Sequence, residues 1–148
     1  MKKYIAIIVI VVVIILLFMG VTQFSEFNKK EETIKVGQAV FSLPEGYEPG
    51  TTDSLGGNTI NNGTNRISIK ERNENITQCL DDYIDYHNGS VYVENILIDG
   101  NNISKTTRYN DTNTHHYFVE KNHKVYDFYA TDGNKNMDST IINMIISG

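Results

Sequence analysis

The chain has 148 residues, a formal net charge of −5 at pH 7, and a single cysteine, Cys79. An acidic chain repels phosphate backbones, which argues against nucleic acid as a partner. A lone cysteine excludes an intramolecular disulfide, and the length suits one domain with one core.

The N-terminal part is dominated by an uncharged apolar segment from Ile5 to Val21, which Lys2 and Lys3 precede. As a helix it would be roughly 26 Å long, close to the thickness of a bilayer's hydrocarbon core. The segment is longer than a typical signal-peptide core, and residues 19–23 make a poor cleavage site. An uncleaved single-pass signal-anchor is therefore favoured over a cleaved signal peptide.

This segment divides the chain into a transmembrane anchor at residues 1–24, a polar stalk at residues 25–33 and a domain at residues 34–148. The lysines before the anchor favour a cytoplasmic N-terminus, although three more lysines follow it closely. Because the N-terminal tail is too short to be a domain, we expect a cell-membrane protein whose C-terminal domain lies outside the cytoplasm. Without the first two lysines, the formal charge of −5 becomes −7 for the rest of the chain.

The domain contains Asn-x-Ser/Thr sequons, more than its Asn, Ser and Thr content would give by chance. They indicate an exported surface that a cell with the machinery can glycosylate. The five sequons begin at Asn62, Asn75, Asn88, Asn102 and Asn110.

The first half of the domain shows the alternation of antiparallel strands. Apolar residues at every second position of residues 34–43 predict a strand pair. Residues 48–57 are rich in Gly, Thr and Pro and predict a loop. Asn62-Gly63 predicts a hairpin between strands at residues 58–61 and 65–72. In the second of these strands, Arg66, Ser68, Lys70 and Arg72 share the face opposite Ile67 and Ile69.

Residues 76–87 change to a helical period, with Asn75 as the N-cap and Gly89 at C′. Cys79 lies on the apolar side of this helix, which predicts a small buried hydrophobe rather than a reactive thiol. The outer side predicts a solvated acidic face rather than a metal site. Its carboxylates are Asp81, Asp82 and Asp85.

Two hairpins follow, with tight turns at Asp99-Gly100 and Asn122-His123. The first joins residues 91–98 to 102–109, and its register pairs Ile96 with Ile103 and Glu94 with Lys105. The second joins residues 114–121 to 124–130. One of its faces is apolar and predicts core, with Tyr117, Val119, Tyr126 and Phe128. The other face, which we expect to lie under a helix or to contact a partner, has His116, Phe118, Asp127 and Tyr129.

A short C-terminal helix is expected to dock on the sheet because it is marginal alone. Its predicted apolar stripe contains Met137, Ile141, Met144 and Ile145, and Asn136, Asp138 or Ser139 can cap it. The order β-β-β-β-α-β-β-β-β-α, with every strand pair explained by a hairpin, predicts the α+β class. The expected architecture is one antiparallel β-sheet of hairpins with two packed helices, preceded by the transmembrane helix.

Two stretches resemble PsbP-like domains. Residues 40–47 are similar to the opening motif F-x-(I/L/V)-P-x-G-(W/F/Y), and residues 122–130 to the late strand N-G-K-x-Y-x-(F/L)-x-A. His123 replaces the usual Gly, Tyr47 stands where Trp is commoner, and an amphipathic helix at Ile141–Ser147 closes the domain. The resemblance implies an antiparallel sheet flanked by helices in a membrane-associated accessory or assembly factor, without catalytic residues. Small membrane-anchored domains of this look also occur among methanogenic archaea.

Catalytic and metal-ligating patterns are weak. His115 and His116 are neighbours on a strand, so they point to opposite faces and cannot share a metal, and His123 lies in a turn. The segment Asp132–Asp138 has oxygen side chains at alternate positions, but it lacks the Gly and the final acidic residue of a calcium loop. We predict no catalytic, cofactor-binding or metal-binding residue.

The favoured function is a membrane-tethered extracytoplasmic binding or assembly module that is not an enzyme and has a protein partner. The alternative is an extracytoplasmic hydrolase or metal-dependent enzyme with an unrecognised site. An exposed aromatic groove without converging titratable groups would favour the binding module. A deep pocket with perturbed His or Asp residues would favour the enzyme.

Overall fold

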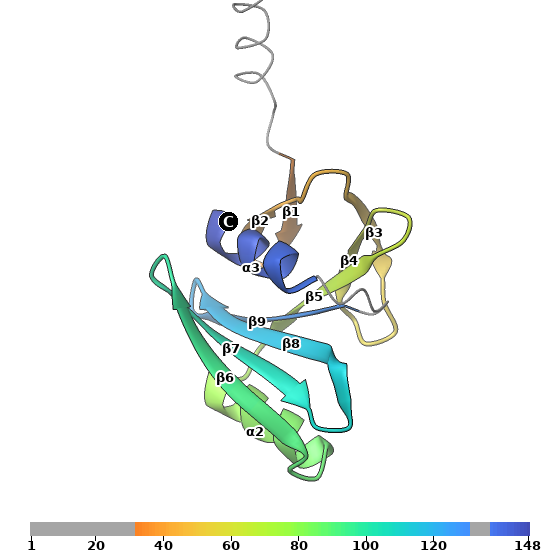
Figure 1. Ribbon diagram of the computed structural model, residues 1–148. Coiled ribbons are helices and arrows are strands. Elements are labelled where there is room, and N and C mark those ends of the chain that lie inside the picture. The colour runs from red at the N-terminus through yellow and green to blue at the C-terminus, as the bar shows by residue number, and fades with distance from the viewer. Residues whose placement is uncertain (1–31, 131–136) are drawn as a thin grey trace, which may run out of the picture. The chain divides into compact units, whose positions relative to one another are not determined.

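A seven-stranded antiparallel sheet is the centre of the fold, in the order β3-β4-β5-β9-β8-β7-β6 (Figure 1). The computed structural model describes residues 32–130 and 137–148. The strands of this sheet are β3 (Glu48–Thr52), β4 (Asn58–Asn61), β5 (Arg66–Arg72), β6 (Val91–Ile98), β7 (Asn101–Arg108), β8 (Asp111–Lys121) and β9 (Lys124–Ala130). A separate two-stranded sheet contains β1 (Thr33–Val36) and β2 (Ala39–Ser42), and the helices are α2 (Ile76–Tyr86) and α3 (Met137–Ser147).

The α+β class and the two helices are confirmed, and three details of the prediction are wrong. The first strand pair forms its own sheet instead of joining the main one. Residues 48–52, predicted as loop, form the edge strand β3. The pairing of β5 with β9 is not a hairpin, since α2 and three strands separate them in the chain.

The predicted anchor from Ile5 to Val21 lies outside the described residues, as does nearly all of the predicted stalk. Among the residues that the structure does describe, no helix is long and apolar enough to cross a membrane.

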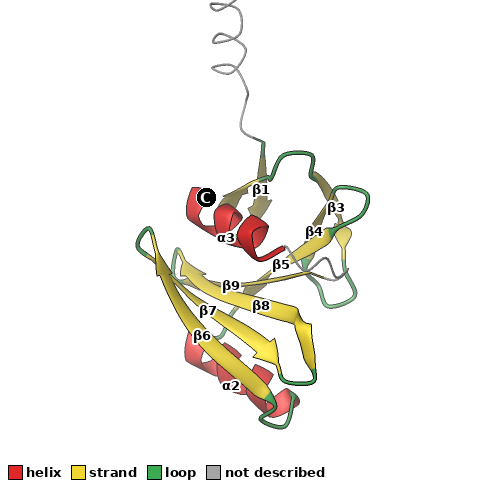
Figure 2. Ribbon diagram, viewed as in Figure 1, coloured by secondary structure: helices red, strands yellow, loops and turns green. Residues whose placement is uncertain are grey.

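The two helices cover opposite faces of the sheet (Figure 2). Neighbouring side chains on a strand point to opposite sides of the sheet, so alternate residues of β8 and β9 face α3 and α2. Tyr117 and Phe128 contact the large core under α3 and the β1-β2 hairpin. Phe118 belongs to a smaller cluster under α2, together with Cys79 and Val125.

The hairpin registers are those that the sequence predicts. Ile96 pairs with Ile103 in the first hairpin, and Tyr117 with Phe128 in the second. Asn122 and His123 both have positive φ, 53° and 61°, as the predicted tight turn requires. The four aromatic and apolar residues predicted as core are each at most 2% exposed.

Helix α2 begins at its predicted N-cap. The Asn75 side chain accepts a hydrogen bond from the Gln78 N–H, and the Gln78 side chain accepts one from the Asn75 N–H, which makes a capping box. The other end differs from the prediction by one residue. Asn88, with φ 53°, occupies C′, and the Gly89 N–H donates to the Ile84 carbonyl in a Schellman motif.

Helix α3 is attached to the sheet by apolar packing and by a polar contact at its first turn. Its predicted stripe is confirmed, since Met137, Ile141, Met144 and Ile145 are all buried. Asp138 lies inside the first turn, where its carboxylate accepts hydrogen bonds from the Lys105 ammonium and the Tyr117 hydroxyl. Most of the segment considered as a calcium loop lies outside the described residues.

Acid is expected to lower the stability of the domain in two stages, an upper stage below pH 6.5 and a lower stage below pH 3.8. Burial and then the Lys105 charge lower the pKa of His115 below 6.5, so stability should fall as the pH drops below 6.5. Burial opposes ionisation of Asp138, but hydrogen bonds from Lys105 and Tyr117 outweigh it and lower its pKa below 3.8. The stability that Asp138 contributes is therefore complete above pH 3.8 and is lost as the pH falls through its lowered native pKa.

Thermal melts between about pH 8 and about pH 2 test this, with His115→Gln as the key variant. The substitution should shrink the upper stage and keep most of the lower stage, because Lys105 and Tyr117 lower the pKa of Asp138 more than the His115 charge does. Part of the upper stage should persist because the pKa of His87 is also lowered. If His115→Gln loses as much stability as the wild type in the upper stage, His115 is not the cause of that loss.

Candidate functional site

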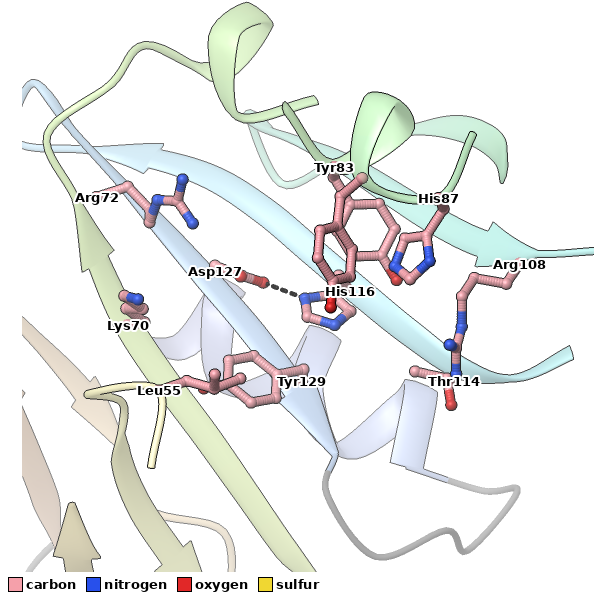
Figure 3. A pocket seen from close by; sticks show the side chains of 11 residues that line it. Leu55, Lys70, Arg72, Tyr83, His87, Arg108, Thr114, His116, Asp127 and Tyr129 are labelled. Carbon is pink, nitrogen blue, oxygen red and sulfur yellow. Dashed lines mark hydrogen bonds and ion pairs between the residues drawn. The ribbon is translucent and has the colours of Figure 1, made fainter. Parts of the chain in front are cut away.

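The α2 face of the sheet contains a pocket of about 400 Å³ (Figure 3). Helix α2 covers Phe118 and Val125 on this face, and the pocket lies beside that covered area. Its lining comes from four strands, the C-terminal end of α2 and the loop before β4. The lining residues are Leu55, Lys70, Arg72, Tyr83, Tyr86, His87, Arg108, Thr114, His116, Asp127 and Tyr129.

Strand pairing brings the floor of the pocket together. Tyr129 lies opposite His116 across the β8-β9 pair, and Asp127 lies opposite Lys70 across the β5-β9 pair. The imidazole of His116 stacks on the Tyr129 ring, with centroids 4.8 Å apart and planes inclined by 18°. The Tyr83 ring, from α2, lies 4.6 Å from the same imidazole. The floor and one wall are therefore aromatic.

A histidine–aspartate pair lies at the centre of the floor. His116 Nδ1 is 2.9 Å from Asp127 Oδ1, and Asp127 is only 5% exposed. A carboxylate at one ring nitrogen fixes the orientation of the imidazole and directs the other nitrogen elsewhere. Within the described residues, no hydroxyl or thiol hydrogen-bonds this imidazole, so a nucleophile next to a base is not formed.

The loop between β3 and β4 forms the opposite rim. Asp53 Oδ1 accepts hydrogen bonds from the Leu55 and Gly57 N–H groups, at 2.9 and 2.8 Å, and Oδ2 accepts one from the Tyr129 hydroxyl at 2.7 Å. Burial alone would raise the pKa of Asp53, but these donors lower it below its usual value. A Cβ on Gly57 would lie 2.8 Å from Tyr129 Oη, so glycine allows this close approach. The loop places Leu55, which is 61% exposed, at the rim.

The charged groups of the lining are mostly cations. Lys70 and Arg72 lie on one side of the floor and Arg108 on the other, while Asp127 is the one carboxylate of the lining (Figure 3). Burial lowers the pKa of His87, and the nearby Arg108 and His116 lower it further. Arg72 forms ion pairs with Glu74 and Asp82, and Arg108 with Asp111, so both guanidinium charges are balanced by neighbouring carboxylates.

Two of the cations have unused donors. Lys70 makes no hydrogen bond or ion pair with any described residue. The Arg108 guanidinium bonds Asp111 through Nη2, but its Nε is buried and has no partner among the described atoms. Buried donors are rarely left without an acceptor, and Arg108 Nε is an exception among the described atoms.

The residues singled out in the sequence fall in different places. His115 and His116 are on opposite faces, as predicted, and His123 lies at the exposed tip of its turn. No group of three or more His, Cys, Asp or Glu side chains could hold a metal within the described part of the chain. Cys79 is 2% exposed, and burial raises the pKa of its thiol.

All five sequon asparagines are exposed. Two of them already have structural roles, Asn75 as the helix cap and Asn62 as the acceptor for the N–H groups of Thr64 and Asn65. Their exposure is compatible with modification.

The sequence predicts two separate faces that contribute to the pocket, but it does not predict the pocket itself. The faces of β5 and of the β8-β9 hairpin were predicted, yet no local signal indicates that β5 pairs with β9. His87 reaches the pocket because it lies at the C-terminal end of α2.

No protein-family model and no curated protein matches the chain. Among solved structures, it is similar to the solution structure of cyanobacterial PsbP (CyanoP) from Synechocystis sp. PCC 6803. The TM-score is 0.40 and the sequence identity 10%, over 73% of this chain and 82% of that chain. A likeness of this degree assigns neither a family nor an activity.

Proposed function

We propose that this protein is a membrane-tethered extracytoplasmic binding module, and that the pocket on the α2 face is its binding site. The observation that supports this best is the concentration of Lys70, Arg72 and Arg108 around one hollow of an acidic domain. Arg72 and Arg108 are ion-paired with neighbouring carboxylates, so Lys70 is the cation left to attract a ligand of the opposite sign. The tether and the outside location rest on the segment Ile5–Val21 and the lysines before it.

A second candidate function is an extracytoplasmic hydrolase that uses His116 as a general base. The hydrogen bond from His116 to the buried Asp127 favours it, since such a carboxylate orients and stabilises a catalytic imidazole. The absence of a hydroxyl or thiol on the imidazole, among the described residues, makes it the weaker candidate. Turnover of p-nitrophenyl esters by the full chain, lost in His116→Gln, would support the hydrolase.

Two measurements on the full-length chain in its native membranes test the binding module. Protease added to sealed spheroplasts should digest the domain, and full protection would contradict the proposed orientation. A photoreactive phenylalanine analogue at Leu55, on the pocket rim, should form an adduct that mass spectrometry detects. The control places the analogue at Leu97, which is 78% exposed and does not line the pocket. Adducts only at Leu97, or at neither position, would contradict the pocket as the binding site.

A further inference from the structure

The pocket also indicates the chemistry of its ligand, and this inference rests on the proposed binding function. We propose that it takes a small organic anion with a flat aromatic body, such as an aromatic carboxylate. The body would lie on the aromatic floor, and the acid group would reach the Lys70 ammonium at its edge.

The aromatic part of the inference comes from the rings that line the pocket. Five of its eleven lining residues have rings: Tyr83, Tyr86, His87, His116 and Tyr129. Tyr86 is 81% exposed, so its ring has free surface at the rim of the pocket. Offset and edge contacts between rings add to the gain from burying their area, so a flat unsaturated ligand is favoured over a saturated one.

The anionic part comes from the donors. Lys70 is a cation without a described partner, and Arg108 Nε is a buried donor without a described acceptor. Lys70 and Arg108 lie on different sides of the aromatic floor, so a ligand on the floor meets a cation at either end (Figure 3). Hydrogen bonds between charged partners are shorter and stronger than neutral ones, so an acid group gains more here than a hydroxyl or an amide.

The size of the pocket fits a small molecule. Its volume of about 400 Å³ lies near the lower end of the range for ligand pockets, which is about 300–1,000 Å³. The rim loop is fixed by three hydrogen bonds to Asp53, so the hollow is built before a ligand arrives. A preformed site of this kind loses little free energy to ordering on binding.

Calorimetric titration of the full-length chain in detergent micelles tests the inference, with empty micelles as the background. The probe is 2-naphthoate, and two matched compounds separate its features: 2-naphthylmethanol lacks the charge, and decahydro-2-naphthoate lacks the aromatic ring. We expect saturable binding of 2-naphthoate and weaker binding of both matched compounds. If 2-naphthylmethanol binds as tightly as 2-naphthoate, the ligand need not be an anion. If decahydro-2-naphthoate binds as tightly, the ligand need not be aromatic.

Protein variants locate the site. Lys70→Met keeps the length of the side chain and should weaken 2-naphthoate binding by roughly tenfold, the effect of losing one charged hydrogen bond. Lys35→Met makes the same change of charge at an exposed position that does not line the pocket, and should bind like the wild type. Equal effects of the two substitutions, or no binding at all, would overturn the proposal.

Two controls distinguish a loss of binding from a loss of folding, and a wrong ligand class from a wrong binding site. Equal melting temperatures of wild type and Lys70→Met show that the loss is not one of folding. A photo-adduct at Leu55 in native membranes, together with no binding of 2-naphthoate, would leave the binding module intact and reject only this ligand class.

Discussion

Replacing Phe128 by alanine is expected to remove most of the domain's stability. Phe128 is completely buried at the centre of the core, and its ring meets Phe41 edge-on with centroids 5.0 Å apart. Truncation of a buried Phe typically costs about 3–5 kcal/mol, while small domains have about 5–15 kcal/mol in total. Phe41 belongs to β2, so the cavity would also weaken the packing of the β1-β2 sheet on the main sheet.

Circular dichroism melts and urea unfolding of residues 32–148 measure the effect. Tyr109→Ala is the matched aromatic truncation, because Tyr109 is 67% exposed, and it should change stability by less than about 1 kcal/mol. His123→Ala should also fold and melt like the wild type, with or without added zinc. Comparable losses in Phe128→Ala and Tyr109→Ala would contradict the core assignment, and zinc stabilisation lost in His123→Ala would revive a metal site.

Introducing a carboxylate under α3, with Ile141→Asp, is the second substitution expected to prevent folding. Ile141 is 1% exposed and packs in the large core. The substitution removes a buried hydrophobe and places an ionisable group without a partner in an apolar site, so we expect a loss of at least about 3 kcal/mol. The free energy of unfolding in urea measures the loss.

The matched control for this helix is Asn143→Asp, which adds the same charge two residues away on the exposed side. It should stay within about 0.5 kcal/mol of the wild type. If both variants unfold, the added charge on α3 is responsible rather than its burial. If both fold normally, α3 does not close the core.

The sequence was most informative where local chemistry determines structure. Asn122 and His123 tolerate the positive φ of a tight turn, and the alternation beyond them then determines which side chains of β8 and β9 are core. Asn75 was identifiable as a cap because its side chain can satisfy the first free N–H groups of α2. Both signals act over a few residues.

Strand β3 could not be predicted, because all five of its side chains are exposed and no alternation results. Its Pro and Gly are tolerated at a sheet edge, where one row of backbone groups needs no partner. The opposition of Lys70 and Asp127 was also unpredictable, since it follows from a pairing between distant strands. The candidate site depends on that pairing, which is why its residues were recognised only as two separate faces.

The pairing of β5 with β9 has a consequence for how the chain acquires its structure. Strand β5 is near the middle of the sheet, yet one of its two neighbours is the last strand to be synthesised. Contacts between distant segments form slowly, because closing the long intervening loop costs entropy before the contacts stabilise it. During synthesis the first half can form only hairpins and α2, and the sheet closes after residue 130 has emerged. For a domain that is exported, as proposed above, this delay would keep the chain unfolded until its last strand has been made.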